Sequence, residues 1–475
     1  MNMPTKEVTL LIEGREVAGG TVIDLREPYG ATPTLRVHLA GGEQVDEAVK
    51  TAVAAFHEFG KQPMYVRAEI LSKVSKEVAA NKPAFVEALI EATGKTRKDA
   101  YGEVDRSVET LSISAEEALR IEGFEVPMEA SPRGKGRIAI ARRYPIGVVA
   151  AITPFNAPLN TVCHKIAPAI AAGNTVVLKP DLRGARVAVM LAQIFHRCGM
   201  PVGGLNVIHG DASVGEQLVT HPQVDVVGFT GSETTGERIT SIAGLKRVLL
   251  ELGGNAPAIV HHDADLNAAV RDLVPASFGL SGQSCISTQR IYVHEQVYQK
   301  FVGDFVVAAK ALKVGDPAAS DTDIGPMVTE DAAKRVESWV HEAAAAGAKI
   351  ECGGKRTGAT VKPTVITQAT HEMTVVCKEV FGPVVTIFSY QDLTDVIAKA
   401  NSTPYGLQAG VYTKSLDVAM RAGRELRFGG VIINGPSRWR LDHMPYGGVK
   451  RSGVGREGPR FAIEDMSELR MLVLG

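Results

Sequence analysis

Five short apolar runs decide the fold of this chain: GVVAAIT (147–153), TVVLKP (175–180), LNVIHG (205–210), DVVGFTG (225–231) and RVLLELG (247–253). Each has the length and the β-branched content of a buried strand, and the four stretches between them are long enough for helices. Strands that alternate with helices in this way predict a doubly wound parallel α/β sheet with right-handed crossovers. Ligand sites are then expected at the carboxyl ends of the strands.

The segments before this region have apolar residues at helical spacing. After a short strand at Val8–Ile12, we predict four amphipathic helices, over 43–59, 64–80, 82–93 and 98–121.

A second α/β pattern starts at Asn255 and continues to about residue 430. It contains strand-like runs such as PAIV and RIYV, and helices are predicted over 298–312 and 330–346. A chain of 475 residues exceeds the size at which one hydrophobic core keeps growing, so a second domain is expected.

Two apolar or alternating segments, GKGRIAIARRYP and the C-terminal LRMLVL, fall outside both patterns. Unpaired strand edges tend to recruit another strand. We therefore expect these segments to pair with another subunit, and we expect a homo-oligomer.

The charge balance excludes a general affinity for polyanions. The 52 Lys and Arg residues nearly match the 53 Asp and Glu residues, which gives a net charge of −1. This gives no electrostatic reason to expect a nucleic-acid partner. The polar start, MNMPTKEVTLLIEG, does not resemble a signal peptide. The charge-free stretch Tyr144–His164 contains three prolines and is not expected to cross a membrane.

Five scattered cysteines, without CxxC spacing, favour neither a disulfide framework nor a zinc site. The chain is therefore expected to be reduced, cytoplasmic and free of a bound metal.

Three residues have the chemistry of an acyl-transfer site. Cys285 in FGLSGQSCISTQR lies among small residues, which would let a reactant approach its thiol, although a lone cysteine is more often an inert apolar residue. Glu251 in LLELGGNAP ends an apolar strand, where burial would raise its pKa toward that of a general base. Asn156 in AITPFNAP has a neutral amide donor suited to an oxyanion. A strand-end carboxylate and a turn asparagine are the alternative interpretations of the last two.

A phosphate site is predicted at FTGSETTGERI, where a strand leads through Gly231 and Ser232 into a helix. Backbone amides at a helix start bind pyrophosphate well. The segment is not GxGxxG, and a simple N-cap serine is the alternative. Lys179, at the end of TVVLKP, has the reach to contact a ribose or phosphate.

From about residue 40 to the C-terminus, the chain resembles the non-phosphorylating aldehyde dehydrogenase superfamily. The segments that carry the resemblance are TPFNAP, GNTVVLKP, FTGSETTG, LELGGNAP, SGQSC, KEVFGPV and MPYGGVKRSGVGREG. It implies a dinucleotide-binding domain (1–122 and 143–253), a catalytic domain (254–430) and an oligomerisation β arm (123–142 and 456–475). It also implies a homodimer or homotetramer.

The resemblance implies that Cys285 is the nucleophile, that Glu251 is the general base and that Asn156 forms the oxyanion hole with the Cys285 amide. Thiolate attack on an aldehyde creates a tetrahedral oxyanion that can expel hydride onto a nicotinamide. Water deprotonated by the glutamate then hydrolyses the thioester.

The resemblance also implies a set of cofactor contacts. Lys179 would hold the adenosine ribose, Ser232 the pyrophosphate and Glu379 the nicotinamide ribose, with Phe381 nearby. The complete predicted set is Thr153, Phe155, Lys179, Gly231, Ser232, Leu252, Glu379 and Phe381.

NAD is the expected cofactor, and NADP remains possible. Family members that prefer NAD commonly carry a glutamate three residues after the lysine, where this chain has Leu182. The next residue, Arg183, has the charge to meet a 2′-phosphate.

Substrate residues are expected at Arg440 in NGPSRWRLDHMPYGG and at Arg106 in GEVDRSVETL. Both resemble arginines of the branch that acts on phosphonoacetaldehyde, glyceraldehyde 3-phosphate or lactaldehyde. Ser284 and Ser287 are further candidates beside the nucleophile. Two converging guanidinium groups favour a phosphonate, phosphate, sulfonate or carboxylate head group.

The alternative is that Arg106 and Arg438 lie on solvated faces while Arg440 braces its loop. The sequence also departs from the phosphonoacetaldehyde pattern, because Ser284 replaces a basic residue and Ala157 replaces a histidine. We expect a small anionic aldehyde as substrate, with a neutral hydroxyaldehyde as the alternative.

Two more distant functions are disfavoured by the same residues. CoA-acylating relatives usually lack the base that Glu251 supplies. A catalytically inactive structural homologue would not be expected to keep Asn156, Glu251 and Cys285 together.

Overall fold

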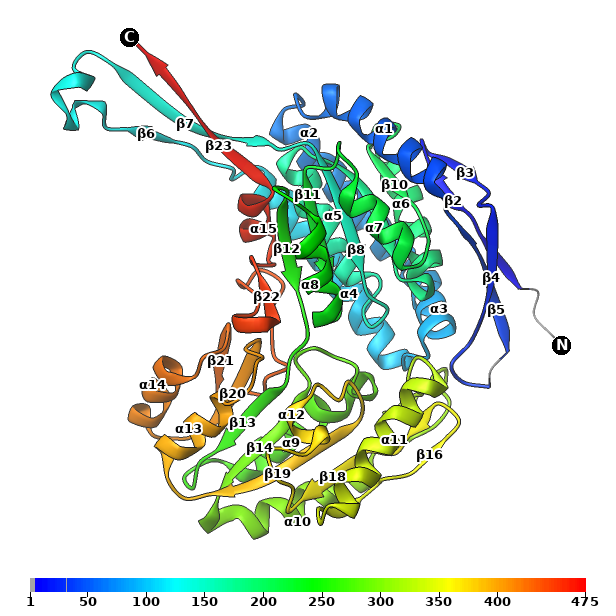
Figure 1. Ribbon diagram of the computed structural model, residues 1–475, viewed down its shortest axis with the longest axis vertical. Helices are drawn as coiled ribbons and strands as arrows, with labels where there is room; N and C mark the ends of the chain where they lie inside the picture. The colour runs from blue at the N-terminus through cyan, green and yellow to red at the C-terminus, as the bar shows by residue number, and fades with distance from the viewer. Residues whose placement is uncertain (1–4, 31) are drawn as a thin grey trace.

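The computed structural model describes residues 5–30 and 32–475 and confirms the α/β fold (Figure 1). Its largest sheet has the strand order β22-β12-β11-β8-β9-β10-β2-β3. The elements of this sheet and its helices are β2 (Leu10–Ile12), β3 (Arg15–Val17), α1 (Gly42–Phe59), α2 (Met64–Ala80), α3 (Lys82–Thr93), α4 (Arg97–Ala118), β8 (Val148–Thr153), α5 (Asn160–Ala172), β9 (Thr175–Pro180), α6 (Ala185–Arg197), β10 (Leu205–Val207), α7 (Ala212–Thr220), β11 (Val226–Thr230), α8 (Glu233–Ile242), β12 (Arg247–Glu251) and β22 (Gly453–Val454).

Alternate residues of the central strands face two separate cores. In β8, Val149 and Ala151 pack under α2 to α6, whereas Val148 and Ala150 pack under α1, α7 and α8. Both faces of a parallel sheet are covered in this way, which explains why the five runs are apolar throughout.

The strand order reverses between β8 and β11. The chain moves from β8 to β9 and β10 in one direction, then returns to β11 and β12 on the other side, and all these pairs are parallel. Thr153 and Thr230 end the two strands at this switch point, where open α/β sheets bind ligands.

The N-terminal region differs from the prediction. The expected strand Val8–Ile12 is split into β1 (Lys6–Val8) and β2, which belong to different sheets. Strands β4 (Thr21–Arg26) and β5 (Pro33–Leu39) were not predicted. They form a hairpin, and β5 pairs with β1. Polar alternation on exposed strands such as β4 gives little apolar signal.

A second sheet, with the order β15-β18-β19-β14-β13-β20-β21, lies below the first in Figure 1. Its elements are β13 (Ala256–Val260), α9 (Leu266–Phe278), β14 (Thr288–His294), α10 (Glu295–Ala311), α11 (Glu330–Ala345), β15 (Lys349–Cys352), β18 (Thr364–Thr367), α12 (Thr374–Cys377), β19 (Val384–Tyr390), α13 (Leu393–Asn401), β20 (Gln408–Tyr412), α14 (Leu416–Glu425) and β21 (Gly430–Ile433). A small hairpin, β16 (Arg356–Thr357) and β17 (Thr360–Val361), lies beside α11. The link 252–255 joins β12 directly to β13, so it brings the carboxyl edge of the first sheet to the amino edge of the second.

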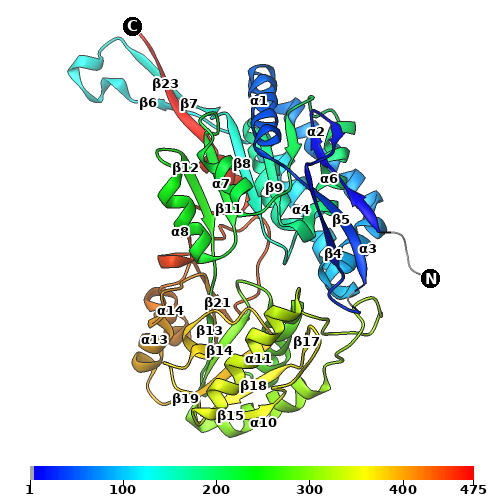
Figure 2. The same cartoon turned by 45° about the vertical axis from the view of Figure 1, so that its right-hand side comes forward.

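The remaining strands form an arm that projects from the upper part of the molecule (Figures 1 and 2). It consists of β6 (Phe124–Val126), β7 (Ile138–Pro145) and β23 (Ser467–Leu474), and the short helix α15 (Pro459–Asp465) leads into it. β7 and β23 pair with each other along their whole length, a pairing that the sequence did not predict. The expected contact with another subunit stays a prediction, because β23 is still an edge strand of this sheet. The division of the chain into three domains stays a proposal.

Candidate active site

Cys285 lies on a strained loop between α9 and β14. Leu280, Ser281 and Gly282 have φ angles of 57°, 54° and 69°, a left-handed region that costs the first two residues energy. The loop is held by hydrogen bonds: the Ser281 hydroxyl donates to the Gly325 carbonyl at 2.8 Å, and the Gln283 side-chain oxygen accepts from the Val328 amide at 3.0 Å. The nucleophile candidate is therefore presented by a fixed turn.

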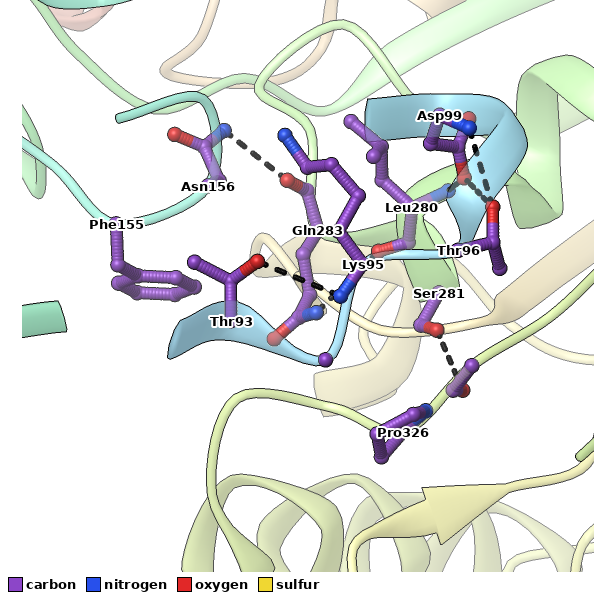
Figure 3. Close-up of a pocket in the computed structure, with 12 residues that line it drawn as sticks. Thr93, Lys95, Thr96, Asp99, Phe155, Asn156, Leu280, Ser281, Gln283 and Pro326 are labelled. Carbon is purple, nitrogen blue, oxygen red and sulfur yellow. Dashed lines mark hydrogen bonds between the residues drawn. The ribbon is translucent and has the colours of Figure 1, made fainter. Parts of the chain in front are cut away.

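Asn156 contacts the same loop from the end of β8. Its side-chain amide donates to the Gln283 carbonyl at 3.0 Å, as Figure 3 shows. One amide hydrogen is thus used to fix the side chain beside the Cys285 turn, and the second remains available to an oxyanion. A cavity of about 20 Å³ lies behind this contact, with room for about one water molecule.

The loop that carries Asn156 is itself braced by a buried ion pair. Lys95 and Glu103 form this pair, and Glu103 also accepts from the backbone amides of Leu159 at 2.8 Å and Asn160 at 3.2 Å. The carboxylate is satisfied on both sides, so it can fix the loop without leaving a buried charge unpaired.

The thiol of Cys285 is partly buried, and its surroundings oppose ionisation. Burial raises its pKa to about 12, and the charges of Glu379 and Glu251 act in the same direction. A reactive cysteine needs a lowered thiol pKa, whereas the surroundings of Cys285 raise it. The Tyr446 hydroxyl lies 3.0 Å from the sulfur and favours the ionised form.

Tyr446 was not selected from the sequence, although its segment MPYGGVKRSGVGREG was. It is separated from Cys285 by 161 residues. The only signal in the sequence was that this residue is a tyrosine, because a buried tyrosine hydroxyl usually needs a polar partner.

Glu251 is buried at the end of β12, and its Oε2 has no hydrogen-bond partner. Burial, with the nearby charge of Glu457, raises its pKa well above the usual 4.5, as the sequence predicted. Its other oxygen approaches the backbone beside Tyr446, because a Cβ placed on Gly447 would lie 2.9 Å from Oε1.

An ion pair lies next to this carboxyl group. Lys165 donates to Glu457 at 2.9 Å, and both side chains are buried. Burial opposes the ionisation of Glu457, but the charges of Lys165, His164 and Arg440 together outweigh it and lower the pKa of Glu457. Glu251 and Glu457 thus form a carboxyl pair whose pKa values are pushed apart, a pattern typical of acid–base sites.

A pocket of about 300 Å³ lies at the carboxyl ends of the first sheet and contains Lys179. Its apolar walls include Phe229 and Ile239, and its polar rim includes Asp211 and Glu216. Burial lowers the pKa of Lys179. The pocket has the size and apolar character of a site for a flat ring with a polar edge.

The predicted phosphate contact lies beside this pocket. Ser232 caps α8, and its hydroxyl oxygen accepts from the Thr235 amide. The helix start after Gly231 leaves backbone amides available to an anion. Leu252 packs with Phe229 and Ile239 in the core under this helix.

Two buried hydroxyl oxygens at the switch point, Thr153 Oγ1 and Thr230 Oγ1, have no hydrogen-bond partner. Buried polar atoms are usually satisfied, so an unsatisfied pair at the ligand-binding edge fits a bound polar group.

Glu379 and Phe381 reach the boundary between the two sheets. The Gly254 amide donates to Glu379 Oε1 at 2.9 Å, and burial raises the pKa of Glu379 to about 7. The rings of Phe155 and Phe381 meet edge to face at 6.0 Å. A Cβ on Gly254 would lie 2.1 Å from the Cys285 carbonyl oxygen, so only glycine permits this approach.

Known proteins resemble this chain over nearly its whole length. The model of the aldehyde dehydrogenase family matches residues 15–472. The chain belongs to this family. A 3-sulfolactaldehyde dehydrogenase from Priestia megaterium is 46% identical over 470 residues, which cover 99% of this chain and 98% of the relative.

Two further relatives define the branch. A lactaldehyde dehydrogenase from Methanocaldococcus jannaschii is 38% identical over 458 residues, covering 95% of this chain and 97% of that protein. The crystal structure of an NADP-dependent glyceraldehyde-3-phosphate dehydrogenase from Bacillus halodurans, complexed with NADP, superposes with a TM-score of 0.97. It is 34% identical and covers 99% of this chain and 100% of that one. The chain is an NAD(P)-dependent aldehyde dehydrogenase.

Leu182 and Arg183, three and four positions after Lys179, do not line the Lys179 pocket. Leu182 packs against the first core. The Arg183 guanidinium donates to the backbone carbonyls of Arg26 at 2.7 Å and Ala92 at 3.1 Å. The expectation that Arg183 could meet a 2′-phosphate is wrong, because this side chain is bound to the N-terminal hairpin and α3.

Arg106 and Arg440 converge on one carboxylate, Asp442. Arg106 donates to it with two nitrogens, Nε at 3.2 Å, and Arg440 approaches it at 3.6 Å. Arg438 lies near Arg106 and donates to the Pro275 carbonyl at 3.0 Å. The Arg440 side chain is 9% exposed, whereas that of Arg106 is 40% exposed.

Ser284 and Ser287, the two candidate serines near the nucleophile, make different contacts. Ser284 directly precedes Cys285, and its carbonyl accepts from the Ser287 amide at 3.0 Å. The Ser287 hydroxyl donates to the carbonyls of Ala276 and Ser277 at the end of α9. We assign Ser287 to the support of this loop instead of to substrate contact.

No helix in 5–30 or 32–475 is long and apolar enough to cross a membrane. Within the same ranges, no group of three or more His, Cys, Asp or Glu side chains is arranged to hold a metal ion.

Proposed function

We propose that this aldehyde dehydrogenase oxidises a small aldehyde with an anionic head group to its carboxylic acid, through a thioester on Cys285. The observation that carries the substrate proposal is the convergence of Arg106 and Arg440 on Asp442, with Arg438 near Arg106 and Arg440 close enough to act on the charge of Cys285. Guanidinium groups bind sulfonate, phosphate and carboxylate through paired hydrogen bonds. The Priestia and Bacillus relatives are named for activity on aldehydes with such groups.

In the first half-reaction, the Cys285 sulfur attacks the aldehyde carbon and the carbonyl oxygen becomes an oxyanion. The free amide hydrogen of Asn156 and the Cys285 backbone amide stabilise this charge. Lys179, Ser232, Glu379 and the Thr153 hydroxyl would hold NAD(P), which supplies the hydride acceptor.

In the second half-reaction, water hydrolyses the thioester. Glu251 takes one proton from this water, and its raised pKa suits that task near neutral pH. The adjacent ion pair of Lys165 and Glu457 stays charged, and the negative charge of Glu457 helps to raise the pKa of Glu251. Hydrolysis releases the acid and restores the thiol.

A neutral hydroxyaldehyde, such as lactaldehyde, is the second candidate substrate. Asp442 already forms an ion pair with the guanidinium group of Arg106 and lies close to that of Arg440. A pocket whose arginines are neutralised internally has less attraction for an anion. The lactaldehyde dehydrogenase among the relatives supports this candidate.

A panel of aldehydes distinguishes the two. Reduced cofactor is followed with 3-sulfolactaldehyde, glyceraldehyde 3-phosphate, succinate semialdehyde and lactaldehyde. We expect kcat/KM to be highest for one of the three anionic aldehydes. The highest value for lactaldehyde would reject the anionic head group while leaving the thioester mechanism intact.

Replacing Arg106 by Gln is expected to raise KM for the anionic aldehydes about ten- to a hundredfold, the scale of one charged hydrogen bond. KM for lactaldehyde is expected to change less than about threefold. Arg120→Gln is the control, because Arg120 pairs with Glu116 and Glu117 just beyond the end of the same helix. Equal increases for charged and neutral aldehydes would contradict the anion site.

We also propose that NAD is preferred to NADP. The carboxylate of Asp211 lines the pocket of Lys179 and would repel a 2′-phosphate, whereas Glu216, in the same pocket, is paired with Arg238. Asp211→Asn keeps the N-cap of α7, because asparagine caps equally well. We expect this variant to lower KM for NADP about two- to fivefold, with KM for NAD unchanged. An unchanged NADP value would exclude Asp211 from cofactor selection.

The arm supports a proposal of self-association into a homodimer or homotetramer. Apolar side chains on β7 and β23, including Ile138, Ile140 and Met471, are more than a third exposed. β23 is also an edge strand of its sheet. Exposed apolar edges of this kind are typical of subunit contacts.

A further inference from the structure

The Tyr446 hydroxyl is the hydrogen-bond partner that the structure gives the Cys285 sulfur, at 3.0 Å. The two residues come from separate segments, because Cys285 precedes β14 and Tyr446 follows the loop that carries Arg440. Their contact places a phenol directly on the reacting atom of the enzyme.

The position of Tyr446 is fixed by its backbone and its ring. Its amide donates to the Glu457 carbonyl at 3.0 Å, and the Glu457 amide donates back at 2.6 Å. The side chain is buried with Ile286 and Leu407. A ring held from both sides cannot turn its hydroxyl away from the sulfur without breaking this packing.

The guanidinium group of Arg440 stacks on the face of the Tyr446 ring. The guanidinium carbon lies 3.7 Å from the ring centroid, a close cation–π contact. The guanidinium is in turn held by His164 at 3.1 Å and by Asp442 and Glu457 at 3.6 Å each. A positive charge on the ring makes the phenol a stronger hydrogen-bond donor.

The chemistry of the pair fixes the direction of the hydrogen bond. Burial raises the pKa of Tyr446 well above 10, so the phenol keeps its proton at physiological pH. Either group can donate while the thiol is neutral, but only the phenol can donate once the sulfur is ionised. The contact therefore favours the ionised sulfur over the neutral one.

We propose that Tyr446 is a catalytic residue that donates a hydrogen bond to the ionised sulfur of Cys285, with Arg440 as the positioning residue on its ring. This role compensates for part of the cost of ionising a buried thiol. Tyr446 loses no proton in the reaction. The proposal concerns the nucleophile alone, so it holds whether the aldehyde is charged or neutral.

Alkylation of Cys285 by iodoacetamide tests the proposal without any aldehyde. The rate is measured from pH 6 to 10 by mass spectrometry of the peptide that contains Cys285, which separates it from the exposed Cys377. We expect Tyr446→Phe to slow alkylation at pH 8 about ten- to a hundredfold and to move the pH profile to higher pH. A profile that superposes on that of the parent enzyme would overturn the proposal.

Two companion variants separate this role from a structural one. Tyr390→Phe removes another buried hydroxyl, which contacts His261 at 2.8 Å, and is expected to leave the alkylation profile unchanged. Arg440→Met is expected to slow alkylation less than Tyr446→Phe does. If Tyr446→Phe lowers the melting temperature no more than Tyr390→Phe but still slows alkylation, the effect belongs to the hydrogen bond. An equal slowing by Tyr390→Phe would contradict the assignment.

Discussion

Glu251→Gln is expected to release one equivalent of reduced cofactor per active site and then almost stop. The amide cannot take a proton from water, so the thioester forms at its normal rate and persists. Loss of a general base of this kind reduces steady turnover about 10²- to 10⁴-fold. Stopped-flow absorbance of reduced cofactor, followed by the steady-state rate, measures both phases.

Hydroxylamine provides the control for this variant. It attacks a thioester without a general base, so it is expected to restore turnover in Glu251→Gln and to leave the parent rate nearly unchanged. A variant that failed through misfolding or lost cofactor binding would show no burst and no rescue. Normal steady turnover would remove Glu251 from the hydrolytic step.

Cys285→Ala is expected to abolish both the burst and the steady rate, by at least about 10⁴-fold. No other described cysteine offers a substitute, since Cys163 is fully buried, Cys377 lies on the surface, and Cys198 and Cys352 pack against the hydrophobic cores of the two sheets. Cofactor should still raise the melting temperature of this variant, because the pocket of Lys179 is untouched.

The matched control is Cys377→Ala, which removes an exposed thiol and is expected to retain full activity. Residual burst in Cys285→Ala, with cofactor binding intact, would show that another group attacks the aldehyde.

The sequence was sufficient to predict the two α/β patterns, because buried parallel strands give continuous apolar runs. It also predicted that Glu251 is buried with a raised pKa and that Asn156 lies beside the nucleophile turn. The first prediction depends on local context, an apolar strand that ends in a carboxylate. The second was implied by the resemblance to the aldehyde dehydrogenase family.

The contacts that tune the site could not be predicted, because they join distant segments. Arg106 meets Asp442 across 336 residues, and Tyr446 meets Cys285 across 161. Their side chains are ordinary in local context, and only the fold brings them together. The same limit applies to the arm, where the pairing of β7 with β23 depends on a register that no short segment encodes.

The resting state of the nucleophile also depends on long-range packing. The small residues around Cys285 suggested a thiol that a reactant can approach, but they gave no sign that burial raises its pKa to about 12. Ionisation therefore has to be supported by groups that surround the sulfur, and Tyr446 is the one in contact with it.

The mass of the covalent intermediate can be measured directly. Glu251→Gln is mixed with a saturating aldehyde and NAD, quenched in acid within the burst and digested, and the peptide that contains Cys285 is analysed by mass spectrometry. We predict that this peptide alone gains the mass of the acyl group, on the sulfur of Cys285. An unmodified Cys285 peptide in a sample that has produced a full equivalent of NADH would contradict the thioester mechanism.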